Sequence, residues 1–381
     1  QFLVLGFCMG SCTGFGIPVA KYFGAGDHKR MKDFIFNGAI LTAVIAVIVT
    51  TLCAVLCPWI LHMLSVQSDI YANAYIYLMI IFLGIPFTLL YNYLSSILRA
   101  VGDSRTPFIF LAFSAVLNIF LDLFFIVVAK WGCAGAAFAT IASQAISGIL
   151  CLFIIIRRMK ILWLSKENRV IKKDAITELL QMGLPTGLQF SITAIGSVIL
   201  QTAVNTLGST AVASVTAGSK VGMFFACPFD AMGATMTTYA GQNVGAGKVD
   251  RVGRGMKACC IIGAVYSAAA FVVLYFFGEQ VSLLFVDAAE QEILHNSWLF
   301  LTINAAFYLL LALVNIVRFT IQGMGFSYLA ILAGVCEMAA RSVVGIFFVP
   351  LIGYKAACFA SPMAWLCADL FLIPAFMYAS K

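Results

Sequence analysis

Long apolar segments, separated by short polar or glycine-rich connections, run through the whole chain of 381 residues. No charged residue occurs from Leu179 to Ser219 or from Phe34 to Leu64. About 20 consecutive apolar residues are enough to cross a bilayer as a helix, so each tract can hold at least one span. Divided at its turn-forming clusters, the chain is predicted to form eleven membrane-spanning helices, over residues 1–23, 34–63, 70–98, 106–128, 134–156, 179–206, 211–243, 256–285, 294–321, 327–349 and 355–380.

The pattern of the first half returns in the second half. Lys21–Arg30 and Gln242–Arg251 both contain Gly-Ala-Gly next to basic residues, and each closes one apolar segment before another begins. A second pair of similar segments is Ile97–Ser104 and Thr320–Ser327. Two copies of one membrane bundle, in the same order, are a sequence sign of a secondary transporter.

The repeat predicts an all-α, polytopic integral membrane protein made of two pseudo-symmetric helical bundles. We expect a first lobe over residues 1–157 with five helices, a basic cytoplasmic linker over 158–178, and a second lobe over 179–381 with six helices. Because the first copy shows one helix fewer and residue 1 already lies in an apolar segment, we expect the first helix of the natural protein to be missing from this chain.

Composition and charge also indicate a membrane protein and its orientation in the membrane. Hydrophobic residues make up 62% of the chain and charged residues 10%, whereas soluble proteins have about half and about a quarter. Most of the 23 Lys and Arg residues fall in every second connection between the predicted spans, and we count Arg318 with these connections. Every second connection lies on the same side of the membrane, and by the positive-inside rule this side is cytoplasmic. The net charge of +7 therefore indicates orientation in a membrane, and we expect no nucleic-acid partner.

Neither a catalytic site nor a metal site is expected. The 12 cysteines lack the paired spacing and the histidine partners of a zinc site, and most fall in predicted spans, where cysteine is a small buried hydrophobe. The three histidines lie at predicted helix ends or in loops, and no Ser-His-Asp set is visible. We therefore predict that the protein is not an enzyme and carries no cofactor.

Charged groups inside spans are the main functional candidates, because they are costly at the centre of a bilayer. Asp122 shares one helix face with Asn118 and Ser114, since residues four apart are neighbours on a helix. These oxygen-bearing side chains are suited to hold a proton or a sodium ion. The alternative is that Asp122 caps the N-terminus of a neighbouring helix.

The corresponding helix of the second copy carries different chemistry. Glu337 aligns with Ser114, and Arg341 aligns with Asn118. A Glu placed four residues before an Arg favours an intrahelical ion pair, which is either a structural lock or a group that binds substrate or ion.

Other polar residues of the second copy are candidates for a substrate cavity. Asp230, close to Pro228, either faces a central cavity and attracts cations or pairs with Lys220, although ten residues make that pair unfavourable. The uncharged polar groups in the span over 179–206 either line a path or bond between helices; they are Gln189, Gln201 and Asn205.

Several segments together resemble the multidrug and toxic compound extrusion (MATE) family, over the whole chain. Besides the Gly-Ala-Gly loops, they are Leu98–Pro107, Leu117–Asp122, Gly135–Thr140, Gly183–Gln189 and Gly241–Lys248. The resemblance implies twelve helices in two lobes of six, and export of mostly cationic or aromatic drugs and metabolites in exchange for Na⁺ or H⁺.

The same resemblance assigns residues and leaves one alternative. Asn118, Asp122 and Thr140 match the polar cluster of the family's first lobe, whereas the acidic residues that another branch uses in its second lobe are missing, which leaves the coupling ion open. We therefore expect a monomeric, multi-pass antiporter of the cytoplasmic membrane that works by alternating access. A flippase for lipid-linked precursors, with a similar pair of bundles, is the alternative.

Overall fold

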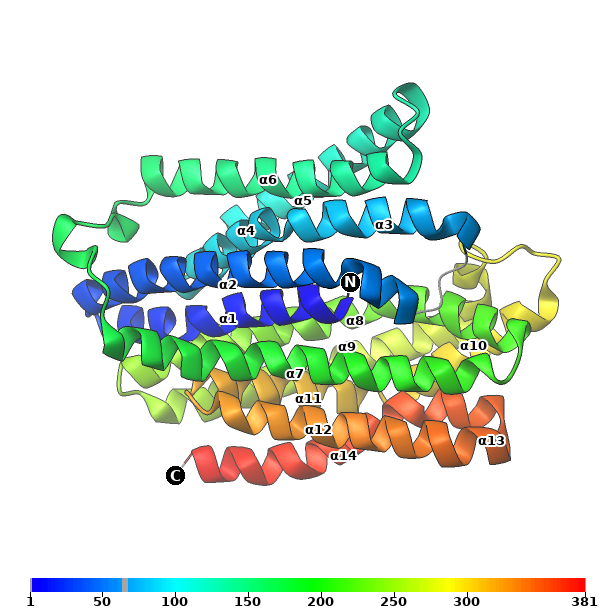
Figure 1. The fold of residues 1–381 in the computed structure, drawn as a ribbon. Coiled ribbons are helices and arrows are strands. Elements are labelled where there is room, and N and C mark those ends of the chain that lie inside the picture. Colours follow the sequence, from blue (N-terminus) through cyan, green and yellow to red (C-terminus); the bar gives the residue numbers. More distant parts are fainter. Residues whose placement is uncertain (1, 64–67, 381) are drawn as a thin grey trace. The chain divides into compact units, whose positions relative to one another are not determined.

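All elements in the described residues, 2–63 and 68–380 of a computed structural model, are helices (Figure 1). Among these described residues, nine helices are long and apolar enough to cross a membrane, and two bent pairs of shorter helices bring the number to eleven if each pair is one span. This agrees with the eleven predicted spans and with the predicted all-α class. The chain divides into two compact units, unit 1 over Gln1–Gly187 and unit 2 over Leu188–Lys381, and the division falls inside helix α7.

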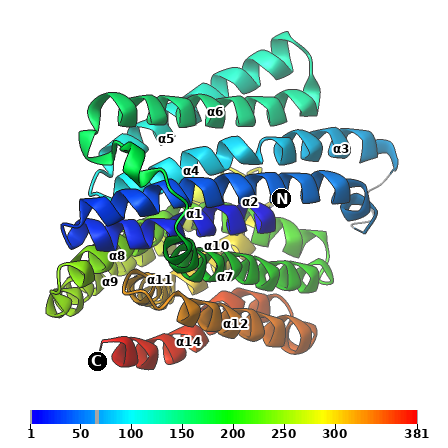
Figure 2. The same cartoon turned by 60° about the vertical axis from the view of Figure 1, so that its left-hand side comes forward.

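Unit 1 contains six helices and the first half of a seventh. They are α1 (Phe2–Gly24), α2 (His28–Met63), α3 (Ser68–Leu83), α4 (Ile85–Ala100), α5 (Arg105–Leu123), α6 (Gly132–Arg158) and the start of α7 (Lys173–Asn205). Helix α1 packs against α2 and α4, and α6 packs against α3, α4 and α5, as both views show (Figures 1 and 2). Hydrophobic side chains of these helices form one continuous core.

The helices of unit 2 follow one another in the same order as those of unit 1. Unit 2 contains the end of α7, then α8 (Ser209–Gly245), α9 (Val249–Ser282), α10 (Gln291–Ala306), α11 (Tyr308–Gly323), α12 (Ser327–Val343), α13 (Val349–Ile352) and α14 (Tyr354–Ala379). Helix α8 packs against α9, α10 and α11, and α14 packs against α11 and α12.

The internal repeat is visible in helix ends and breaks. Gly26 and Gly247, which close the two Gly-Ala-Gly segments, have φ of +73° and +70°, a left-handed conformation that favours glycine after a helix C-terminus. The α3–α4 pair bends by 42° and the α10–α11 pair by 52°. A π-helical turn follows each of two corresponding helices: η1 (Phe124–Val128) after α5 and η4 (Val344–Phe348) after α12.

The segment between α6 and α7 is folded onto unit 1. It forms two 3₁₀ turns, η2 (Lys160–Leu162) and η3 (Lys166–Asn168), and α7 begins at Lys173, inside the predicted linker over 158–178. Asp33, which is 3% exposed, accepts hydrogen bonds from Asn168 Nδ2 at 2.9 Å and Lys172 Nζ at 2.5 Å. The buried carboxylate Asp33, near the start of α2, therefore fixes the linker.

Small residues allow two helices of unit 1 to approach closely. A Cβ atom added at Gly14 of α1 would lie 2.6 Å from both the Cα of Gly183 and the carbonyl oxygen of Met182, on α7. Both neighbours are backbone atoms, so the helices would have to separate. Without water, association of helices in lipid depends on such close packing.

Replacing Gly14 with valine is expected to destabilise unit 1. Overpacking a close contact typically costs about 1–3 kcal/mol, so the melting temperature of the purified protein should fall by several degrees. Gly253→Ala is the matched control, because a Cβ added at Gly253, inside α9, would meet no atom within 4 Å. Equal melting temperatures for Gly14→Val and the wild type would contradict the close packing.

Candidate functional site

Helices α5 and α6 of unit 1 pack against each other and both carry polar residues. Asp122 and Asn118 lie one turn apart on α5, and Ser114, 3% exposed, follows on the same face. Asp122 Oδ1 and Asn118 Nδ2 are buried atoms with no hydrogen-bond partner in the described residues. The alternative in which Asp122 caps a neighbouring helix is thus not supported by any hydrogen bond there.

Helix α6 brings further polar groups to the same level. Ser147 Oγ donates to the carbonyl of Phe110 at 3.3 Å, and Gly135 lies against Phe125, which fixes the antiparallel register of α5 and α6. This register places Thr140 beside the turns that carry Asn118 and Asp122. Thr140 Oγ1 itself donates to the carbonyl of Ala136 at 3.0 Å.

Gln144, one turn beyond Thr140, was not predicted from the sequence. Its Oε1, like Asn118 Nδ2 and Asp122 Oδ1, is a buried atom without a hydrogen-bond partner in the described residues. The signal was available, because Gln144 lies four residues after Thr140 and therefore shares its helix face. We call Ser114, Asn118, Asp122, Thr140 and Gln144 the unit 1 polar cluster.

The unit 1 polar cluster has the chemistry of a site for a proton or a hard monovalent cation. It offers one carboxylate with amide and hydroxyl oxygens, and hard cations prefer oxygen ligands. Within the described residues, no group of three or more His, Cys, Asp or Glu side chains is arranged to hold a metal ion.

Unit 2 contains a buried network of charges. Glu337, 3% exposed, binds two arginines: Arg318 of α11 through Oε1, and Arg341 of its own helix through Oε2 at 3.6 Å. The ion pair between Glu337 and Arg341 is therefore present as the spacing predicted. Its role in structure or in transport stays a prediction.

The expectation that Arg318 belongs to a cytoplasmic connection is wrong. Arg318 lies within α11 and is 4% exposed. Its position inside the predicted span over 294–321 was the signal that it is buried. Asp369 of α14, 3% exposed, lies within electrostatic range of Arg318, and neither of its carboxylate oxygens has a hydrogen-bond partner in the described residues.

Within the described residues, no hydrogen bond connects all of the candidate cavity residues of unit 2. Gln189 is 3% exposed and accepts a hydrogen bond from Gln322 Nε2 at 3.3 Å, inside the unit. Gln201 donates to Asn205 at 3.0 Å, at the end of α7. The contact of Gln189 joins α7 to α11 and matches the alternative of bonds between helices, whereas the contact of Gln201 lies within α7.

Asp230 is separate from these three residues. It is exposed, and its Oδ1 accepts a hydrogen bond from Asn315 Nδ2 of α11 at 3.3 Å. Lys220, the other partner considered, lies with its Nζ 5.6 Å from the ring centre of Phe285. Asp230 therefore presents a carboxylate at the surface of α8, next to the buried charges that surround Arg318.

Comparison with known proteins identifies the family. The sequence model of the family described as MatE matches residues 1–124 and 185–352, more than half of the chain. The chain belongs to the MatE family. The predicted membership of the multidrug and toxic compound extrusion family is thereby confirmed, and the chain is a multi-pass membrane protein.

Among relatives of this MatE chain, the "Probable multidrug resistance protein YpnP" of Bacillus subtilis is 30% identical over 75% of the chain and 64% of the relative. The "Probable multidrug resistance protein YoeA" of the same organism is 26% identical over 85% of the chain and 71% of the relative. The match to YpnP thus spans less than two thirds of that relative's length.

Solved structures share the fold at low sequence identity. An outward-facing "multidrug resistance MATE family transporter" aligns with a TM-score of 0.93 and 19% identity, over 100% of this chain and 86% of that one. A transporter from Pyrococcus furiosus, described as having reverse polarity of its binding pocket, aligns with a TM-score of 0.91 and 18% identity over the same shares.

The charge network of this MatE chain predicts an order of severity among variants. Glu337→Gln should be the most harmful, because it leaves Arg318 and Arg341 buried without their partner, and an uncompensated buried charge costs about 3–5 kcal/mol. Arg341→Gln should be milder, since the contact between Arg318 and Glu337 remains. Folded yield and melting temperature in detergent measure both effects.

The double variant Glu337→Gln with Arg318→Gln is the control for this prediction. It should recover part of the folded yield, because it removes one of the two unpaired cations together with the carboxylate. Wild-type stability of Glu337→Gln, combined with lost transport, would instead assign Glu337 to the transport path.

Proposed function

We propose that this MatE chain is part of a multidrug efflux transporter, which exports small organic molecules across the cytoplasmic membrane in exchange for Na⁺ or H⁺ by alternating access. The family, the internal repeat and the names of the relatives support transport. The observation that carries the coupling proposal is the unit 1 polar cluster, with its buried, unpartnered carboxylate oxygen.

The coupling role follows from the cost of an isolated charge. A carboxylate in a low-dielectric interior, without a cationic partner, gains stability when a proton or a cation neutralises it. No ion pair of Asp122 occurs in the described residues, so an ion from solution would not have to displace a side chain. Ion binding would therefore change the charge of the helix contact from negative to neutral.

Cationic substrates are supported by Asp230. The carboxylate is exposed on α8, and Asn315 holds it through a single hydrogen bond that leaves one carboxylate oxygen free of that contact. Bulky aromatic cations have delocalised charge, so little hydration is lost when they bind to such a group. A positively charged substrate and a coupling cation would then use carboxylates in different units.

The flippase alternative is less well supported. A cavity for phosphate-bearing lipid precursors needs unpaired cations, whereas Glu337 holds both Arg318 and Arg341 in unit 2. The exposed Asp230 carboxylate would also repel a phosphate.

Asp122→Asn should abolish coupled export. The amide has nearly the same shape but cannot bind a proton or balance a cation, so ion-driven efflux should fall at least tenfold while folding is preserved. The assay uses the native protein in proteoliposomes, with a pH gradient in one arm and a Na⁺ gradient in the other. The arm that drives wild-type efflux identifies the ion.

Asp287→Asn is the matched control, because Asp287 is an exposed acid outside the helices and should keep wild-type rates. Undiminished efflux by Asp122→Asn under both gradients would remove Asp122 from the mechanism. Lipid-precursor translocation without drug efflux would favour the flippase.

Asp230→Asn should selectively weaken export of cations. Loss of one favourable charge contact worth about 1.4 kcal/mol corresponds to tenfold in affinity, so the half-saturating concentration of a cationic aromatic drug should rise by about that factor. A neutral drug of similar size should be transported as before. Equal losses for both drugs would show that Asp230 does not recognise substrate charge.

A further inference from the structure

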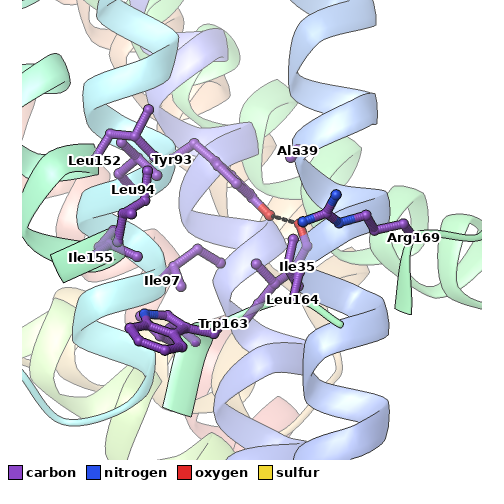
Figure 3. Close-up of a pocket in the computed structure, with 12 residues that line it drawn as sticks. Ile35, Ala39, Tyr93, Leu94, Ile97, Leu152, Ile155, Trp163, Leu164 and Arg169 are labelled. Carbon is purple, nitrogen blue, oxygen red and sulfur yellow. Dashed lines mark hydrogen bonds between the residues drawn. The ribbon is translucent and has the colours of Figure 1, made fainter. Parts of the chain in front are cut away.

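A cavity of about 620 Å³ lies within unit 1, apart from the unit 1 polar cluster (Figure 3). Its walls come from α2, α4 and α6 and from the folded linker. The lining is almost wholly apolar, and Ile35, Ile97, Ile155, Leu162, Trp163 and Arg169 belong to it. Its volume is within the range of about 300–1,000 Å³ that is usual for small-molecule sites.

The cavity has a buried floor and an exposed rim. Ile97 and Leu162 are 2% and 4% exposed, whereas Ile156 and Trp163 at the rim are 59% and 46% exposed. The cavity therefore opens at the outer surface of the unit.

Its position along the membrane normal follows from the neighbouring charges. Ile97 lies in the same helical turn as Arg99, at the end of α4, and Ile155 and Ile156 directly precede Arg157, at the end of α6. Helix ends that carry arginine mark the cytoplasmic interface. The rim therefore opens to the acyl chains of the cytoplasmic leaflet.

The linker gives this apolar cavity one cationic edge. Arg169 is exposed, and in Figure 3 its side chain extends toward Tyr93 and Ile35. The Tyr93 hydroxyl already donates to the Ile35 carbonyl at 2.6 Å. No ion pair of Arg169 occurs among the described residues, so its charge is available to a ligand.

The cavity is fixed by the fold. Besides the contacts to Asp33, the linker backbone is bound by Asn37 of α2, whose Nδ2 donates to the Val170 carbonyl at 3.1 Å and whose Oδ1 accepts from the Lys172 amide at 3.0 Å. These two hydrogen bonds lie just after Arg169, and the bond from Asn168 Nδ2 to Asp33 lies just before it, so the backbone of Arg169 is held at the edge of the cavity.

We propose that this cavity binds one anionic phospholipid of the cytoplasmic leaflet, with an acyl chain against Ile97 and Ile155 and the phosphate at Arg169. The apolar floor suits the chain, the exposed indole of Trp163 suits the interface, and a basic pocket on the cytoplasmic side suits an anionic headgroup. A lipophilic cation fits the same volume but would meet the charge of Arg169. The site is independent of the proposed transport function.

Fluorescence quenching tests the proposal directly. The protein is reconstituted with brominated-chain phosphatidylglycerol or brominated-chain phosphatidylcholine, and the Trp163 signal is the difference between the wild type and Trp163→Phe. Phosphatidylglycerol should quench this signal at about one fifth of the lipid fraction that phosphatidylcholine requires, the preference expected for one basic residue near anionic lipid.

Two pairs of variants separate the parts of the site. Arg169→Gln should remove the preference for phosphatidylglycerol, whereas the substitution Arg158→Gln should keep it, because Arg158 is the exposed last residue of α6 and lies outside the lining. Ala39→Phe fills the cavity and should reduce quenching by both lipids. Ala43→Phe, one turn away on α2 and outside the lining, should not.

Several results would overturn the proposal. They are equal quenching by both lipids, an unchanged preference in Arg169→Gln, and displacement of the lipid by a lipophilic cation at micromolar concentration, which would mark a drug site. If Trp163→Phe does not fold, native mass spectrometry replaces the fluorescence measurement. It measures how much phosphatidylglycerol stays bound to Arg169→Gln and to Arg158→Gln. Equal retention by these two variants would reject the role of Arg169.

Discussion

The cost of an uncompensated polar group in lipid determines how this chain is built. Without water, every backbone amide and carbonyl needs an internal partner, and only helices provide one within each span. Charged side chains inside the spans face the same cost. Glu337 meets it by binding Arg318 and Arg341, and Asp33 meets it by binding the linker.

Asp122 and Asp369 are the exceptions. Their buried carboxylate oxygens have no partner in the described residues, although each lies in a helix packed against others. The two units also differ at equivalent places, because the position of Ser114 in unit 1 is taken by Glu337 in unit 2. One scaffold thus holds an unpaired acid in its first copy and an acid bound by two arginines in its second.

Much of this fold could be predicted from the sequence. Uncharged tracts gave the spans, and glycines such as Gly26 and Gly247 marked helix ends, because both signals are local. The environment of Arg318 could not be predicted, since its partner Glu337 lies on another helix and the pairing depends on helix rotation. The docking of the linker on Asp33 was missed for the same reason. In the unit 1 polar cluster, four-residue spacing found Asn118 and Asp122, and the same spacing from Thr140 indicates Gln144. The sequence could not show that the two pairs lie beside each other, because that depends on the register of α5 and α6.

The fixed linker also has a mechanical consequence. Asp33 and Asn37 hold the linker to α2, so the linker belongs to unit 1. The segment that connects unit 1 to unit 2 is therefore the continuous helix α7, which crosses the division after Gly187. Just before that point, Pro185 lacks the amide hydrogen that would bond the carbonyl of Gln181, so this turn of the helix has one backbone hydrogen bond fewer. The two copies are thus connected by a single continuous helix, and its missing backbone hydrogen bond falls at the turn immediately before the division.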